Sequence, residues 1–468
     1  MAINDIVTAL PPGVHYSLYV DDLAIYVKGS DIPPLQSLLQ SAVMSVSRWA
    51  SNHGFRFSTA KSCAITFTRK RAIPQPPIYL YDTPLQYRSS ATFLGLVFDS
   101  RLTWDHHVSS LKTSALRRLQ LLQTLSHVTW GADRRTLLSL HKALVLSKLD
   151  YGCQVYSSAS PSVLGKLDTV HNEGLRLALG AFRSSPVESL YSEAGVLSLS
   201  YGRSLVSLRY YTKLHQFPSS SVLRVSPKVQ TAVLAHPRLR PTFSLRMQSL
   251  LTGTQFSSLK VLPFRPALYP PWLLPYPKVC KSILPSWKSS CPPEALRSDF
   301  VAHLESHSSA VPIYTDGSKT SRATSFAVLF PTQSYQYCLP QAAGILTAEL
   351  YALLKAVEHV HLHNHSSFVI FSDSLSALRL LQSNSFHPLK LQILEWLFRI
   401  SVKKKSVQFC WVPSHVGVPG NEKVDSLART VDSSLTSSLP IPASDFFPAF
   451  FALLRSRWQC SWSSFGDQ

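Results

Sequence analysis

The chain has 468 residues, which at about 150 residues per domain predicts roughly three structural units. Its 46 Lys and Arg residues against 26 Asp and Glu residues give a formal net charge of +20. This balance is typical of proteins that bind a polyanion, most often nucleic acid. Apolar residues make up 45% and charged residues 15% of the chain, a composition that excludes a largely disordered protein.

The seven cysteines are scattered along the chain, odd in number, and form no C-x-x-C pair. This distribution predicts neither a disulfide framework nor a zinc site, and it fits a reducing compartment. The N-terminus lacks the pattern of a signal peptide, and no uninterrupted apolar run is long enough to span a bilayer. We therefore expect an intracellular protein, nuclear or cytoplasmic, without a membrane partner.

Residues 14–27 place strand-forming residues on both sides of Asp21 and Asp22. The pattern predicts a β-hairpin with two acids at its tip. Aspartate is common in turns, so a purely structural role for the pair has about half the weight. In the functional interpretation, the turn presents a carboxylate to a metal that is bound by nucleotide phosphates.

The run Tyr19-Val20-Asp21-Asp22 resembles the polymerase motif of reverse transcriptases, and the residues downstream of it are similar to the end of the palm and the thumb of non-LTR retrotransposon enzymes. The supporting segments are residues 49–55, 61–62 and 91–96. In that family another essential aspartate and the nucleotide-binding strands lie well upstream, whereas only 18 residues precede Tyr19 here. The resemblance implies a partial palm over residues 1–108, with Asp21 and Asp22 a vestigial motif that cannot polymerise alone.

Residues 109–215 show helical periodicity and are similar to the thumb. Asp133 is a suitable N-cap for one helix, which ends before Gly152. Another helix is predicted between Ser160 and Gly180. Their apolar stripes are expected to form core.

Residues 216–310 contain 13 prolines and are predicted to form an irregular connection. The same segment has eleven Lys and Arg residues against three acidic residues. It either lines a path for nucleic acid or is a solvated basic linker, two interpretations of about equal weight.

Residues 311–435 alternate short strands and helices, which predicts an α/β domain with a mixed five-stranded sheet and flanking helices. Residues 436–468 are expected to form a C-terminal tail. Strands are expected near residues 311–316, 324–330, 334–339, 367–372 and 406–412, and helices near 347–361, 374–383, 389–401 and 420–431.

Four carboxylates stand out in this domain. Asp316 and Asp373 each end an apolar strand, and the carboxyl ends of neighbouring strands are where sites are usually built. Glu349 borders the apolar stripe of the first helix, from which it can point into a cleft, and Asp425 lies on the last helix. Taken singly, each acid has an ordinary role as a turn, cap or helix residue.

Together, the four acids and their surroundings resemble the ribonuclease H family over about 120 residues. The most specific block runs from Trp411 to Asp425, with His415 ten residues before Asp425. The other matching runs are Thr315-Asp316-Gly317-Ser318, Ala348-Glu349 and Ser372-Asp373-Ser374.

The resemblance implies that Asp316, Glu349, Asp373 and Asp425 hold two magnesium or manganese ions. Hard oxygen ligands suit these metals. His415 would assist proton movement or product release. The implied reaction cuts the RNA strand of an RNA-DNA hybrid and leaves 5′ phosphate and 3′ hydroxyl ends.

Our leading hypothesis is therefore a ribonuclease H type endonuclease at the C-terminal end of a truncated retrotransposon polyprotein. One alternative is a catalytically inactive remnant that binds nucleic acid. The other is a residual RNA-directed DNA polymerase that needs a partner for its missing palm. Residues 311–435 have eleven basic and eight acidic residues, so most of the positive charge that would hold a hybrid lies outside them.

Overall fold

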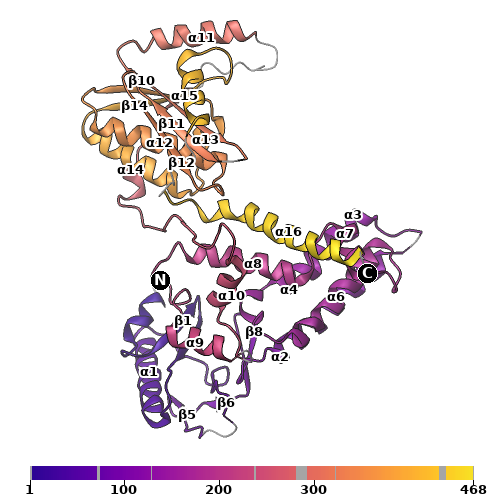
Figure 1. Ribbon diagram of the computed structural model, residues 1–468. Coiled ribbons are helices and arrows are strands. Elements are labelled where there is room, and N and C mark those ends of the chain that lie inside the picture. The colour runs from indigo at the N-terminus through magenta and orange to yellow at the C-terminus, as the bar shows by residue number, and fades with distance from the viewer. Residues whose placement is uncertain are drawn as a thin grey trace. The chain divides into compact units, whose positions relative to one another are not determined.

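The computed structural model describes residues 3–70, 74–127, 129–236, 239–280, 292–321, 323–431 and 439–466. The chain divides into two compact units, Met1–Val206 and Ser207–Gln468. Each unit has its own buried apolar clusters, as expected for segments that bury enough surface to fold. Figure 1 labels their elements.

The first unit opens with the predicted hairpin. Strands β1 (His15–Tyr19) and β2 (Asp22–Tyr26) pair antiparallel, with Tyr19 opposite Asp22. Asp21 and Asp22 are exposed at the hairpin tip, as expected. Helix α1 (Ile32–Asn52) comes next and buries one apolar face that includes Val43 and Val46. The other elements here are short: η1 (Ile3–Ala9), β3 (Cys63–Ala64), β4 (Tyr79–Leu80), β5 (Thr83–Pro84), β6 (Gln86–Tyr87), β7 (Ser90–Phe93) and β8 (Leu96–Asp99).

The segment after β8 is helical, as predicted. Asp133 caps its helix by accepting hydrogen bonds from the amides of Arg135 and Thr136 at 2.8 and 3.1 Å. Ser160 caps a second helix, which ends at Gly180 in the left-handed conformation. Both predicted helices are confirmed. The elements are α2 (Asp105–Leu125), α3 (Arg134–Leu140), η2 (His141–Leu146), α4 (Ser147–Asp150), α5 (Cys153–Tyr156), α6 (Pro161–Leu179), α7 (Val187–Ala194) and α8 (Leu199–Leu214).

The proline-rich segment contains more regular structure than the sequence suggested. The run around Pro270 and Pro271 stays irregular apart from one 3-10 turn, because proline interrupts helical hydrogen bonding there. The elements in this segment are α9 (Pro227–Ala235), α10 (Phe243–Leu251), η3 (Pro271–Leu273), β9 (Val279–Cys280) and α11 (Pro293–Glu305).

The predicted α/β domain contains a mixed sheet of six strands in the order β12-β11-β10-β13-β14-β9. The five expected strands are β10 (Val311–Lys319), β11 (Thr324–Leu329), β12 (Ser334–Leu339), β13 (Ser367–Ser372) and β14 (Ser406–Trp411). The prediction of five strands needs correction, because β9 pairs parallel with β14 and extends the sheet. This two-residue strand satisfies backbone groups that the edge of β14 would otherwise expose.

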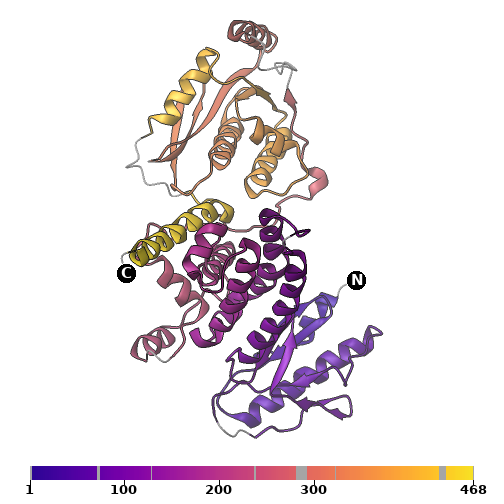
Figure 2. The ribbon, with the colours of Figure 1, turned by 90° about the vertical axis from the view of Figure 1, so that its right-hand side faces the viewer.

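Helices cover both faces of this sheet (Figure 2). On one face, α12 (Ile345–Leu362) packs on β10 and β11, with α13 (Leu375–Gln382) and α14 (Pro388–Val402) beside it. On the other face lie α15 (Pro419–Arg429) and α11. All four predicted helices of the domain are present within about two residues of their expected bounds.

The segment after the domain folds back onto it. Ile441 bridges to Val261, and the Asp445 carboxylate accepts a hydrogen bond from the Gly344 amide, at the start of α12, at 2.8 Å. Helix α16 (Phe446–Gly466) comes directly after this contact. Although α16 has 21 residues, neither it nor any other described helix is apolar enough to cross a membrane.

Candidate functional site

Two neighbouring strands position the first two acids. Asp316 lies inside β10, which continues past it to pair with β11, and Asp373 directly follows β13. Thr315 is opposite Ser372 in the parallel β10–β13 pair, which puts both acids at one end of adjoining strands. The Trp411 indole donates a hydrogen bond to the Asp373 carbonyl at 3.1 Å and holds that backbone in place.

Helix α12 brings the third acid to the same place. Glu349 lies in its second turn, and a close approach between α12 and β10 buries it. That approach depends on Gly317, since a Cβ there would lie 2.9 Å from the Glu349 amide nitrogen. The sequence placed Glu349 at the border of the apolar stripe, from which it could point into a cleft, and in the structure the residue is only 6% exposed.

Asp316, Glu349 and Asp373 each place a carboxylate oxygen within 4.8 Å of the other two. Asp316 Oδ2 and Glu349 Oε2 are buried and have no hydrogen-bond partner. Burying an unpaired carboxylate oxygen is costly, so such atoms indicate a missing cation or donor.

The electrostatics of the trio agree with this interpretation. Burial raises the pKa of Asp316 to about 8, and the neighbouring charges of Asp373 and Asp425 add to the effect. Burial holds the pKa of Glu349 well above its usual range, and the neighbouring negative charges of Asp316 and Asp373 add to the effect. Burial also raises the pKa of Asp373, although a hydrogen bond from Asn421 opposes the change. A bound cation would reverse these shifts.

Asp425 belongs to an adjoining group on α15 and the preceding loop. Its carboxylate, His415 and Glu422 have ligand atoms within 4.8 Å of one another. Arg429 Nε donates to Asp425 Oδ1 at 2.8 Å. His415 is exposed on a turn with φ of 57°, and its Nδ1 lies 4.0 Å from Glu422 Oε2. The structure therefore places all five predicted site residues in one neighbourhood.

Sequence reasoning missed two residues that touch these acids, Asn421 and Arg429. Asn421 is 2% exposed and hydrogen-bonds to Asp373, while Arg429 pairs with Asp425. The signal was present in their spacing, because residues 421, 425 and 429 recur every four positions and so share one face of α15.

The donor set fits a hard divalent cation. All four predicted ligands are carboxylates, two of their buried oxygens lack partners, and one arginine pairs with Asp425 while no described ion pair joins the other three. Magnesium and manganese prefer oxygen ligands of this kind.

Asp21 and Asp22 have a different environment. Both are exposed at the tip of a hairpin, where Val20 adopts a positive φ of 54°. Within the described part of the chain, no cluster of three possible metal ligands includes either residue.

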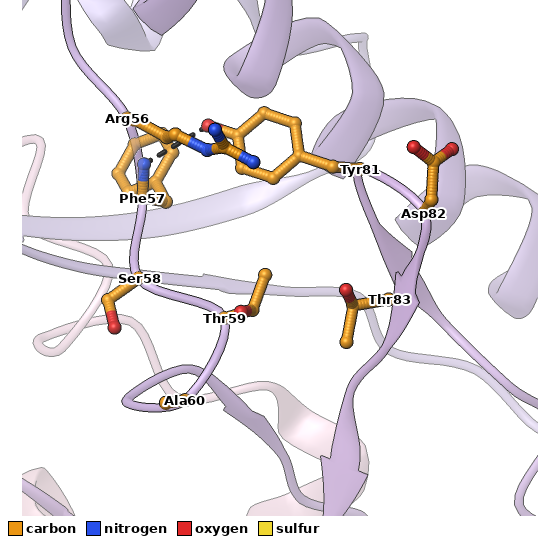
Figure 3. A pocket seen from close by; sticks show the side chains of 8 residues that line it. All are labelled: Arg56, Phe57, Ser58, Thr59, Ala60, Tyr81, Asp82 and Thr83. Carbon is orange, nitrogen blue, oxygen red and sulfur yellow. Dashed lines mark hydrogen bonds between the residues drawn. The ribbon is translucent and has the colours of Figure 1, made fainter.

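A pocket in the first unit contains none of the predicted site residues (Figure 3). Its wall includes Arg56, whose guanidinium lies 5.2 Å from the centre of the Tyr81 ring. The Tyr81 hydroxyl accepts a hydrogen bond from the Phe57 amide at 3.1 Å. Asp82 is the one acid among the residues that line the pocket, so the pocket lacks the cluster of carboxylates that could hold a cation.

The mixed sheet and its converging acids define a ribonuclease H class of domain, and residues 308–432 match the model of the RNase H family. The chain therefore contains an RNase H domain. The predicted resemblance to this family and to retrotransposon reverse transcriptases is confirmed.

Curated relatives of the chain are retrotransposon proteins. It is 27% identical to the probable RNA-directed DNA polymerase from transposon X-element of Drosophila melanogaster, over 35% of this chain and 18% of that protein. It is 25% identical to the RNA-directed DNA polymerase from mobile element jockey of the same species, over 47% of this chain and 24% of that protein. It is 23% identical to the retrovirus-related Pol polyprotein from type-1 retrotransposable element R1 of Bradysia coprophila, over 33% of this chain and 16% of that protein. The matched regions thus span less than a third of the length of each of these three relatives.

Proposed function

We propose that this chain hydrolyses the RNA strand of RNA-DNA hybrids. The observation that carries the proposal is the group formed by Asp316, Glu349 and Asp373, two of which keep a buried carboxylate oxygen without a partner. The RNase H domain over residues 308–432 supports the same substrate class.

The four acids of the site are the proposed metal ligands. Asp316, Glu349, Asp373 and Asp425 would hold two divalent cations, of which magnesium is the expected metal. When bound, these cations supply the positive charge that polarises the scissile phosphodiester and the attacking water. The chain itself positions the ligands, because β10, β13, α12 and α15 fix one acid each.

Three further side chains support the ligands. Asn421 hydrogen-bonds to Asp373, and Arg429 holds Asp425, so both orient a carboxylate before the cation arrives. His415 stands on an exposed turn beside Glu422, where it can move a proton or help the product leave.

The charge distribution supports a proposed route for substrate binding. Residues 311–435 contain eleven basic and eight acidic residues, whereas residues 216–310 contain eleven basic and three acidic residues. We propose that this basic segment contributes to holding the phosphates of the hybrid. Binding that depends on it should weaken steeply with salt.

A cleavage assay with the 468-residue chain tests the function. Wild-type protein with magnesium is expected to cut a labelled RNA strand paired with DNA, and Asp316→Asn is expected to abolish cutting. Asp299→Asn is the matched control, because Asp299 is an exposed acid on α11 in the same unit. Equal loss in both variants would contradict the site.

The same preparation separates the alternatives. Wild-type protein that binds the hybrid but never cuts it, with any added metal, would favour the inactive binding protein. Primer extension by the isolated chain would favour a residual polymerase through Asp21 and Asp22.

A further inference from the structure

A second group of metal-ligating side chains uses residues that have no part in the proposed ribonuclease site. Cys280 ends β9, and Cys410 is its partner in the parallel register on β14. His303, on α11, places its Nε2 atom 3.3 Å from Cys410 Sγ. The ligand atoms of all three residues lie within 4.8 Å of one another.

The donor types differ from those of the acidic site. Two thiols and an imidazole are soft or intermediate ligands that select zinc over magnesium. In a tetrahedral zinc site with bonds of about 2.3 Å to sulfur and about 2.0 Å to nitrogen, neighbouring ligand atoms lie about 3.3–3.8 Å apart. The observed 3.3 Å between His303 Nε2 and Cys410 Sγ is a hydrogen-bond distance that lies close to the about 3.5 Å expected for a sulfur–nitrogen pair in such a site.

His307 lies beside this group, although its ligand atoms are not within 4.8 Å of those of all three other residues. It follows His303 at the H-x3-H spacing of many zinc sites, and the two ring centres are 4.5 Å apart. His307 Nδ1 lies 3.0 Å from the His303 carbonyl oxygen, so Nε2 is the nitrogen that would bind a metal after a rotation of the side chain away from Gln408. That Nε2 lies 3.3 Å from Oε1 of Gln408, which is two residues before Cys410 on β14 and therefore on the same face.

Burial favours the neutral form of the Cys410 thiol. Cys410 is fully buried, and burial together with the adjacent Cys280 raises the pKa of its thiol to about 12. Zinc that binds Cys410 would therefore displace the proton of this thiol to solvent.

We propose that Cys280, His303 and Cys410 form a structural zinc site that fastens β9 and α11 to β14, with His307 as the fourth ligand after its side chain rotates. The site would connect segments that are far apart in sequence but meet at the β9 edge of the sheet. It lies next to an apolar cluster in which Phe300 of α11 packs on Phe371 with ring centres 5.2 Å apart. Val412 and Val418, which flank the loop of His415, belong to the same cluster.

Metal analysis of the intact chain tests this proposal. Wild-type protein, purified without a metal-affinity step, is expected to hold about one zinc ion per chain. Cys410→Ser and His303→Ala are expected to lower that content at least about fivefold. Cys338→Ser is the matched control, since Cys338 lies on β12 at the opposite edge of the sheet, and it should keep its zinc.

Cobalt supplies a readout that does not depend on how the variants fold. Wild-type protein that has been stripped and reloaded with cobalt is expected to show thiolate-to-cobalt absorption. A slower reaction of the thiols with a thiol reagent should accompany it, and added magnesium should not produce either effect.

Several results would overturn the proposal. One is wild-type protein that binds neither zinc nor cobalt through thiolates. Another is a disulfide between Cys280 and Cys410 in protein purified under reducing conditions. A third is equal loss of zinc in Cys338→Ser. Unchanged zinc affinity in His307→Ala would overturn the assignment of His307 as the fourth ligand.

Discussion

The two units carry acidic motifs in opposite environments. Asp21 and Asp22 are neighbours in sequence and exposed on one hairpin. Asp316, Glu349 and Asp373 are distant in sequence, come from three elements, and converge in a largely buried group. Adjacency in sequence therefore does not by itself create a cation site. Convergence supplies enough ligands, and burial makes each carboxylate depend on a cation.

The largest effect should come from removing charge inside the converged group. Glu349→Gln is expected to slow hybrid cleavage by at least about 1000-fold, or about 4 kcal/mol of transition-state stabilisation. Glu358→Gln is the control on the same helix, because Glu358 pairs with Lys355 at 2.6 Å outside the group. Single-turnover kinetics measure the cleavage rate of both variants. A comparable loss of rate in Glu358→Gln would mean that the effect is not specific to the converged acids.

A smaller loss is expected at the edge of the site. His415 is exposed, so replacing it should remove proton transfer or product release without disturbing the buried acids. His415→Asn keeps a residue that tolerates the positive φ, and it should lower turnover about 10- to 100-fold with little change in KM. Comparison of the first turnover with later ones shows which step has slowed. Loss of hybrid binding instead would assign His415 to substrate contact.

The buried acids also predict an effect of pH on magnesium binding. The pKa of Asp316 is raised to about 8 in the folded protein, from an ordinary value of 3.8. Its contribution to metal-free stability is thus complete below the ordinary pKa, and it is lost as pH rises through about 8. Magnesium must displace this proton, so its affinity should rise with pH, at most about tenfold per unit for each proton released.

Thermal unfolding with and without magnesium, from about pH 6 to about pH 9, measures this linkage. The magnesium-induced rise in melting temperature should grow across the series. Asp316→Asn should flatten the trend, because the titrating group is gone. A magnesium effect that is constant with pH in wild-type protein would mean that the acids are already ionised.

The smallest effect is expected at the hairpin. Replacing both Asp21 and Asp22 by asparagine should change hybrid cleavage less than about twofold, because exposed side chains without partners contribute little. Their stability effect should lie within about 0.5 kcal/mol. Cleavage kinetics and thermal unfolding check both statements. A large loss of cleavage would show that the hairpin contributes to the ribonuclease.

Much of the RNase H domain could be predicted because its elements are patterned locally. The strands are short apolar runs, such as Ser367–Ser372, and the helices have clear periodicity. In the first unit, Asp133 and Gly180 mark helix ends by capping chemistry that acts within one turn. These signals do not need the tertiary fold.

The remaining features depend on contacts between distant segments. Strand β9 has two residues, and only the free edge of β14 makes it a strand. Burial of Glu349 depends on the absence of a side chain at Gly317. Cys280 and Cys410 form no sequence motif, so scattered cysteines gave no sign of the group they make with His303. Pairing and register decide these features, and local propensity does not encode them.

The hydrogen bond from the Gly344 amide to Asp445 bears on where the domain can be cut. The family match ends at residue 432, before Asp445, yet Asp445 places a negative charge at the N-terminus of the helix that carries Glu349. A fragment trimmed to the family's borders would retain all four acids and lose an anchor of one of them. A fragment that keeps this contact at the start of α12 therefore has to extend through Asp445, beyond the residues that match the family.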